Sequence, residues 1–297
     1  YCGVIIDNTY LYMGTDNGIL IYNYRTDRYE QPATDFPTDV RTMALQGDTL
    51  WIGALNGLYT YQLQNRKLSP LDTKRNGLPH NTIYSIIRTG DNQIYVGTYN
   101  GLCRYIASNG KFEKIPLPVN SSQSNLFVNS LLEDTGRQCI WIGTEGYLFQ
   151  YFPSTGQMKQ TEAFHNNSIK SLALDGNGDL LAGTDNGLYV YHNDVTPLQH
   201  IIHDSRNIQS LTNNIIWNIF ADQEHNIWLG TDYGISLSRY NSALQFIPIS
   251  QITGTGDGNQ FYSLFRDSKG FYWFGGTNGL IRFTDPAGDK RSEEHTS

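Results

Sequence analysis

Ile94-Tyr-Val-Gly-Thr-Tyr-Asn-Gly-Leu-Cys-Arg-Tyr105 is one of seven copies of a twelve-residue pattern in this chain of 297 residues. In each copy a short apolar segment ends at a glycine, a tight turn follows, and a second segment ends in an aromatic residue in six of the seven. The first glycines are Gly14, Gly53, Gly97, Gly143, Gly183, Gly230 and Gly275. Their spacing of 39 to 47 residues is too long for leucine-rich or ankyrin repeats and is typical of one four-stranded propeller blade.

Each copy also has an apolar strand before it and a shorter strand after it, as at residues 83–88 and 111–115. The turn inside the copy contains Asn-Gly in five units, which is a strong hairpin signal because both residues tolerate positive φ. In the fourth unit the glycine comes one place early, at Gly146, and in the sixth Tyr233 replaces the asparagine. We expect altered geometry in those two turns.

The strand that leads into each first glycine is apolar at nearly every position, which indicates that both of its faces are buried. Four of the five tryptophans share one position of this strand: Trp51, Trp141, Trp228 and Trp273. Stacked propeller blades bury both faces of their sheets, so these side chains are expected to pack between blades. The fold class predicted is all-β, a seven-bladed β-propeller of four-stranded antiparallel blades, with the last blade incomplete.

We expect one propeller domain over residues 1–290. Residues 291–297 resemble the translation of a sequencing adaptor and are set aside as a non-native tail, so that the natural chain is expected to continue. The net charge is −7, which argues against general binding to nucleic acid or to an anionic membrane. No run of apolar residues is long enough to span a membrane. Cys2, Cys103 and Cys139 have no metal-type spacing and are expected to be unpaired structural residues.

A strand ending in Asp, a glycine turn and Trp-Ile-Gly-Thr-x-x-Gly-Leu-x-x-Tyr together resemble the two-component-regulator propeller repeat. Residues 216–235 and 261–280 are especially similar to it. The resemblance covers residues 1–286 and implies the periplasmic sensor region of a hybrid two-component histidine kinase from Bacteroides or a relative. In that family two propellers and an immunoglobulin-like domain precede the membrane helix, the kinase and a DNA-binding domain.

The resemblance further implies a non-catalytic sensor of glycan-derived oligosaccharides that acts as a homodimer of the full-length protein. None of the kinase motifs is present in these residues, so the chain is expected to be a fragment of the sensing part. Whether the seven units form one natural propeller or parts of two is left open by the sequence.

Candidate ligand contacts come from aligning the leading strands of the blades. The residue at the position after the first apolar residue varies between the blades, and by strand alternation its side chain should face the central channel or its mouth. Aromatic, cationic and amide groups can stack on sugar rings and bond their hydroxyls. The same rim is expected to carry three further residues of the turns and loops. The candidate set is Arg41, Tyr84, Asn129, Lys170, Trp217, Tyr262, His80, Tyr99 and Tyr233.

Other chemistries are less favoured by the sequence. Asp16, Asp185 and Asp232 could suggest a glycosidase, which needs two carboxylates across a scissile bond, but aspartate at this position favours the turn itself. His200 and His203 would point to opposite faces of a strand, so no metal site is expected. No cofactor is expected either. A polysaccharide lyase or hydrolase, and a ligand-free dimerisation scaffold, are the alternatives to the sensor.

Overall fold

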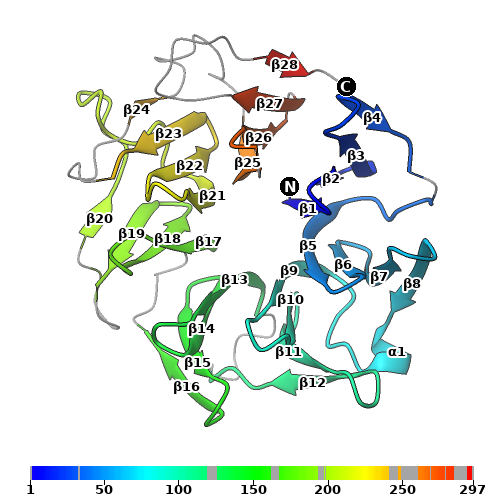
Figure 1. Ribbon diagram of the computed structural model, residues 1–297. Helices are drawn as coiled ribbons and strands as arrows, with labels where there is room; N and C mark the ends of the chain where they lie inside the picture. Colours follow the sequence, from blue (N-terminus) through cyan, green and yellow to red (C-terminus); the bar gives the residue numbers. More distant parts are fainter. Residues whose placement is uncertain are drawn as a thin grey trace. The chain divides into compact units, whose positions relative to one another are not determined.

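The computed structural model describes residues 2–32, 34–118, 126–161, 167–192, 197, 199–240, 247–248, 260–267, 269–277, 279–283 and 293–295. The chain divides into two compact units, unit 1 (residues 1–145 and 149–160) and unit 2 (residues 146–148 and 161–297). Seven four-stranded sheets follow one another along the chain (Figure 1). These sheets confirm the predicted class, an all-β propeller of seven antiparallel blades.

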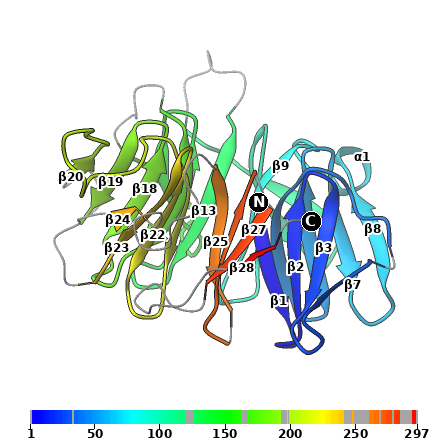
Figure 2. The same cartoon turned by 90° about the horizontal axis from the view of Figure 1, so that it is seen from above.

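Unit 1 contains four of the sheets, each built from strands that are consecutive in the chain. Figure 2 shows β1, β2 and β3 of the first sheet side by side. Between β8 and β9 lies the short helix α1 (Thr73–Asn76), which Asp72 caps by accepting hydrogen bonds from two backbone N–H groups. The strands are β1 (Cys2–Ile6), β2 (Tyr10–Thr15), β3 (Gly18–Asn23), β4 (Arg28–Glu30), β5 (Val40–Gln46), β6 (Thr49–Ala54), β7 (Gly57–Gln62), β8 (Lys67–Leu71), β9 (Ile83–Arg88), β10 (Ile94–Thr98), β11 (Gly101–Ile106), β12 (Lys111–Ile115), β13 (Val128–Asp134), β14 (Cys139–Thr144), β15 (Leu148–Phe152) and β16 (Gln157–Gln160).

Unit 2 contains the other three sheets, again in chain order. Its strands are β17 (Ile169–Leu174), β18 (Leu180–Thr184), β19 (Gly187–Tyr191), β20 (Gln199–Ile201), β21 (Ile216–Ala221), β22 (Ile227–Thr231), β23 (Gly234–Ser238), β24 (Ile247–Pro248), β25 (Phe261–Arg266), β26 (Tyr272–Gly276), β27 (Gly279–Phe283) and β28 (Glu293–His295).

The last sheet combines an expected and an unexpected feature. Residues 261–283 supply three strands, as expected of an incomplete blade, and β28 then pairs with β27 as a fourth. β28 lies within residues 291–297, which are expected from the sequence to be a non-native tail. An outer strand presents unpaired N–H and C=O groups, so an extended segment of almost any sequence can pair with it. The rest of that segment, residues 291–292 and 296–297, lies outside the described residues, and the single-domain assignment stays a prediction.

A threonine closes the turn between the second and third strands of a blade. Thr98 Oγ1 donates to Gly101 O (2.9 Å) and accepts from Asn100 N–H (3.0 Å). Thr15, Thr184 and Thr231 make the same two bonds. The sixth turn, with Tyr233 in place of asparagine, therefore keeps the common geometry. The prediction of an altered geometry for this turn is wrong. Threonine and the positive-φ glycine form this turn, so asparagine is not required.

In five of the seven repeats the first glycine lies where the next blade packs. A Cβ on Gly53 would lie 2.6 Å from Ile83 Cγ2, and one on Gly230 would lie 2.6 Å from Phe261 O. Ile83 and Phe261 each begin the leading strand of the following blade. Glycine is needed here because any side chain would push neighbouring sheets apart.

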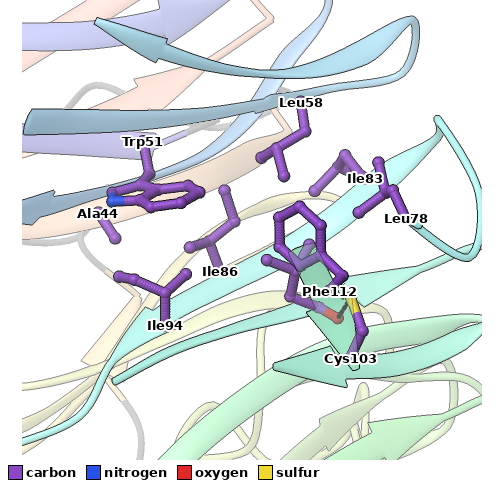
Figure 3. Close-up of a cluster of buried hydrophobic side chains, with 10 residues drawn as sticks. Ala44, Trp51, Leu58, Leu78, Ile83, Ile86, Ile94, Cys103 and Phe112 are labelled. Atoms are coloured by element: carbon purple, nitrogen blue, oxygen red, sulfur yellow. Dashed lines mark hydrogen bonds between the residues drawn. The ribbon is translucent and has the colours of Figure 1, made fainter. Parts of the chain in front are cut away.

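The core between neighbouring sheets is apolar on both sides. In unit 1, Trp51 and Leu58 of the second sheet meet Ile83, Ile86 and Ile94 of the third (Figure 3). All five side chains are buried. Within unit 1 this confirms the prediction that Trp51, on the second strand of its blade, packs between two blades.

The indole N–H groups of three further tryptophans are bound by aspartates at the ends of leading strands. Trp141 Nε1 donates to Asp134 (3.1 Å), Trp228 Nε1 to Asp222 (2.8 Å) and Trp273 Nε1 to Asp267 (2.7 Å). Asp222 and Asp267 each also accept backbone N–H groups of the following turn. The aspartate of the repeat therefore satisfies a buried donor and shapes a hairpin at once.

Candidate functional site

Six of the nine candidate residues occupy the extra position of a β-bulge. Where β9 pairs with β10, Ile83 faces Thr98 and Ser85 faces Gly97, which leaves Tyr84 as the additional residue. The same shift occurs at the start of five other leading strands. A bulge turns a side chain away from the direction that simple alternation gives it. The bulge residues are Arg41, Tyr84, Asn129, Lys170, Trp217 and Tyr262.

The sequence-based prediction derived the direction of these six side chains from strand alternation. That reasoning is wrong, because alternation does not hold at the extra residue of a bulge. Their proximity to the turn between the second and third strands follows from pairing, since the start of the leading strand lies beside the end of the second. The expectation that they face a central channel stays a prediction.

In unit 1, Tyr84 belongs to a cluster of four aromatic side chains. Its ring contacts Phe127 edge-on at 6.0 Å between centroids. The Phe127 ring lies 4.3 Å from that of Tyr99, and the Tyr99 ring lies 4.8 Å from that of His80. All four are partly exposed. We call His80, Tyr84, Tyr99 and Phe127 the aromatic platform.

Hydrogen bonding and charge define the polar side of the platform. His80 Nδ1 accepts a bond from Thr82 N–H (3.0 Å), which fixes the imidazole ring. The pKa of Tyr84 is raised, first by burial and then by nearby Tyr99 and Glu145, while Arg41 acts in the opposite direction. The Tyr84 hydroxyl is therefore protonated at neutral pH and can donate as well as accept a hydrogen bond.

The other two bulge residues of unit 1 pair with carboxylates. Asn129 Nδ2 donates to Glu145 Oε1 (3.0 Å). The Arg41 guanidinium lies 3.9 Å from Asp16 and 3.8 Å from Asp39, both partly exposed. Arg41 and Asn129 are thus paired with acidic side chains of neighbouring turns and loops.

In unit 2 the bulge residues of consecutive blades form one continuous network. Lys170 Nζ bonds Asp185 (2.8 Å) and lies over the indole of Trp217, 4.3 Å from the ring centroid. This arrangement combines an ion pair with a cation–π contact. The Trp217 ring in turn meets that of Tyr262 edge-on at 5.2 Å.

Two further residues complete the network in unit 2. Asp232 Oδ1 accepts from Trp217 Nε1 (3.1 Å) and from Gln260 Nε2 (2.6 Å). Gln260 accepts a bond from the Tyr262 hydroxyl. The indole, the amide and the phenol are thereby locked together across two neighbouring blades.

Tyr233 differs from the other candidates in unit 2. Its backbone N–H bonds Thr231 Oγ1, and its side chain is 54% exposed. The bonds that define the network run through Asp232, its neighbour in the chain. Tyr233 lies on the same turn as the network, and a ligand role for it stays a prediction.

The turn aspartates have a role that the sequence did not predict. Threonine closes the turn, and the carboxylates of Asp16, Asp185 and Asp232 instead face bulge residues. The expectation that these aspartates form the turn is therefore wrong, because the threonine hydroxyl already occupies the backbone groups that they would bind. Phe127, Glu145 and Gln260 were also missed; no repeat pattern marks them, since they lie in loops or at a variable turn position.

The two histidines considered for a metal have other partners. The His200 ring stacks on Tyr189 at 4.0 Å and its Nε2 lies 2.6 Å from Asn186 O. His203 Nδ1 lies 2.5 Å from Leu211 O. Among the described residues no group of three or more His, Cys, Asp or Glu side chains could hold a metal ion. Nor does any helix in the described part of the chain have the length and apolar character to cross a membrane.

Comparison with known families identifies the class of the repeats. Residues 77–100, 210–233 and 255–278 match the family model for the two component regulator propeller. These three segments are therefore similar to the two-component-regulator propeller repeat, as the sequence motif predicted.

The chain is 91% identical to the extracellular domain of BT4673 from B. thetaiotaomicron, described as a putative hybrid two component system in one crystal structure and as a putative one component system in another. The TM-score is 0.79 for both, and the match covers 99% of this chain but only 40% and 39% of those chains. Histidine kinase P4 of Formosa agariphila is 28% identical over 92% of this chain and 21% of that protein. This chain thus spans less than half the length of each of these relatives.

A more distant similarity concerns the fold alone. Virginiamycin B lyase from Staphylococcus aureus has a TM-score of 0.71 at 13% identity, covering 94% of this chain and 92% of the lyase. At that identity the lyase activity gives no information on the chemistry of this chain.

Proposed function

We propose that this chain is part of the extracellular sensor of a hybrid two-component system and binds a glycan-derived oligosaccharide without catalysing its cleavage. Signal output would come from a histidine kinase elsewhere in the parent chain. The similarity to the BT4673 extracellular domain and to a histidine kinase supports the sensor role. A periplasmic location of this part, in a protein anchored in the inner membrane, belongs to the same proposal.

The observation that carries ligand binding is the series of bulge residues. Six blades place five different residue types at one equivalent position, each next to a carboxylate or an aromatic ring. A residue required only for folding would repeat in kind, as the first glycine and the turn threonine do. Aromatic faces together with ammonium, amide and carboxylate groups are suited to stacking on sugar rings and bonding their hydroxyls.

The charges at this position support a neutral ligand over a polyanionic one. Lys170 is paired with Asp185, and Arg41 lies between Asp16 and Asp39. Each cation thus has at least one carboxylate beside it, within a chain of net charge −7. A sulfated or uronic-acid-rich glycan would have to compete with those carboxylates.

Isothermal titration with a panel of neutral and acidic plant and host oligosaccharides tests the proposal. It should be performed on this chain and on the complete extracellular domain, with Trp217→Ala and the control Tyr240→Ala. Tyr240 is exposed, and its ring contacts His225 in the turn between β21 and β22, at the strand ends away from the network. We expect saturable binding that Trp217→Ala weakens and Tyr240→Ala does not.

Chromatography of the same sugars after incubation distinguishes sensing from catalysis. A sensor returns them unchanged, whereas shorter products would support the lyase or hydrolase alternative. Absence of binding by both proteins across the whole panel would contradict the sensor proposal.

The parent protein is proposed to act as a homodimer, with a second propeller and an immunoglobulin-like domain in the same chain. Sedimentation of the complete extracellular domain with and without bound sugar measures this directly. A ligand-dependent change in self-association is expected. A monomer under both conditions would contradict the dimer proposal for the extracellular part.

A further inference from the structure

The aromatic platform of unit 1 differs in kind from the network of unit 2. In unit 2, Lys170 covers one face of the Trp217 indole, and the polar atoms of Trp217, Asp232, Gln260 and Tyr262 bond one another. A ligand there would have to displace protein contacts. In unit 1, ring contacts join the four residues of the platform.

The platform is assembled from four separate places in the chain. His80 comes from the loop after α1, Tyr84 from the bulge of β9, Tyr99 from the turn after β10 and Phe127 from the residue before β13. Phe127 is its central ring, because it contacts both Tyr84 and Tyr99. All four side chains are partly exposed, which places an aromatic surface at one end of the strands.

Polar groups border this surface. Arg41 and Asn129 occupy the bulges of the two blades that flank the blade of Tyr84, so a guanidinium lies on one side of the platform and the Asn129–Glu145 pair on the other. Asn129 holds Glu145 in place through a 3.0 Å hydrogen bond. An aromatic face bordered by one acidic and one basic group, with a protonated phenol between them, suits a ring with C–H groups on one side and hydroxyls at its edge.

We propose that His80, Tyr84, Tyr99 and Phe127 form a stacking subsite for one pyranose ring of a neutral oligosaccharide, with Phe127 as the residue that positions the ring. The proposal rests on the proposed sensor function and specifies the site and the sugar class for it. The C–H face of the sugar packs on Phe127 and Tyr99. The Tyr84 hydroxyl and the Glu145 and Arg41 side chains bond the hydroxyls.

The test uses the neutral disaccharides cellobiose, β-1,4-galactobiose and β-1,4-mannobiose, with digalacturonic acid as the acidic probe. The proteins are the unaltered chain, Phe127→Leu, Phe127→Ala, Tyr99→Ala, Trp217→Ala and the control Tyr29→Ala. Phe127→Leu keeps apolar volume while removing the ring, so it remains informative if the alanine variant fails to fold. Tyr29 is an exposed aromatic residue on β4 that packs on Tyr22.

We expect at least one neutral disaccharide to bind and Phe127→Leu or Tyr99→Ala to weaken it about tenfold, the loss expected for one stacked ring. Tyr29→Ala should leave the affinity unchanged. Tyrosine ring signals in NMR spectra of the unaltered chain should shift on titration with the same sugar, which a merely structural role of Phe127 would not produce.

Three outcomes would overturn the proposal. If a neutral sugar binds and Trp217→Ala weakens it while both Phe127 variants do not, the sensor function stands and the platform is not its site. If digalacturonic acid binds more tightly than every neutral probe, the sugar class is wrong. If none of the four probes binds the unaltered chain, the platform proposal fails, and the wider oligosaccharide panel on the complete extracellular domain then decides the sensor function separately.

Discussion

Trp217 Nε1 donates a 3.1 Å hydrogen bond to Asp232 Oδ1, which fixes the extra residue of a β-bulge to the turn that follows it in the same sheet. Asp232→Ala removes this acceptor and is expected to loosen the indole. Because the other four tryptophans are buried, acrylamide quenching of fluorescence reports mainly on Trp217. Quenching should increase in Asp232→Ala and stay unchanged in Asp48→Ala, an exposed aspartate of unit 1. Equal quenching in all three proteins would show that the bond does not hold the indole.

Asp222 is expected to be among the most sensitive polar residues of unit 2. Its carboxylate accepts bonds of 2.8 Å from both Trp228 Nε1 and the Tyr272 hydroxyl, which belong to neighbouring blades. Asp222→Ala leaves these two buried donors without their acceptor and should lower the free energy of unfolding by about 3 kcal/mol. Urea unfolding of the variant beside Asp48→Ala measures the difference. A loss no larger than that of Asp48→Ala would contradict the structural role given to Asp222.

Gly53→Ala tests the close approach of neighbouring blades in unit 1. The new Cβ would lie 2.6 Å from methyl carbons of both Ile83 and Thr42. We expect a destabilisation of about 1–3 kcal/mol, typical of an overpacked core, and a lower melting temperature. Gly136→Ala is the matched control, because the nearest atom to its Cβ would be Asp134 Oδ1 at 3.5 Å. Similar melting temperatures for the two variants would argue against this packing.

Asp134 should make the stability of unit 1 sensitive to acid. Burial acts to raise its pKa, but hydrogen bonds from Arg137 N–H, Trp141 Nε1 and the Arg137 guanidinium outweigh it and hold the pKa below the ordinary value of 3.8. A lowered folded-state pKa stabilises the fold above that ordinary value, and the stabilisation is lost as the pH falls through the folded-state pKa.

Urea unfolding of the unaltered chain and of Asp134→Asn between pH 6 and pH 3 measures this contribution. The unaltered chain should be the more stable at pH 6, and the difference should shrink toward pH 3. A constant difference across the range would mean that ionisation of Asp134 makes no contribution.

The repeat itself made the fold predictable from the sequence. The recurring glycine fixes the spacing of the units, and the apolar pattern of residues such as Ile94–Thr98 indicates a strand buried on both faces. Each such strand contacts a neighbouring sheet as well as its own, so local pattern and tertiary packing give the same answer. A fold can be predicted from its sequence when the local pattern and the tertiary packing agree in this way.

The site was less predictable, because it depends on exceptions to the regular pattern. Strand alternation cannot reveal that Tyr84 or Trp217 is the extra residue of a bulge, since the shift is visible only when the partner strand is placed beside it. The threonine at the turn is common to most repeats, and its hydroxyl frees the adjacent aspartate for another partner. Phe127 lies outside the repeat, and only the folded chain brings it to Tyr84 and Tyr99.

The contact between the first glycine of one repeat and the leading strand of the next has an evolutionary consequence. Gly53 and Ile83, like Gly230 and Phe261, form a joint that involves only two adjacent repeats. A gene that duplicates or loses a whole repeat therefore carries a working joint with it, whatever the length of the intervening loop. The side chains at the bulges can diversify in each copy at the same time, because none of them takes part in that joint.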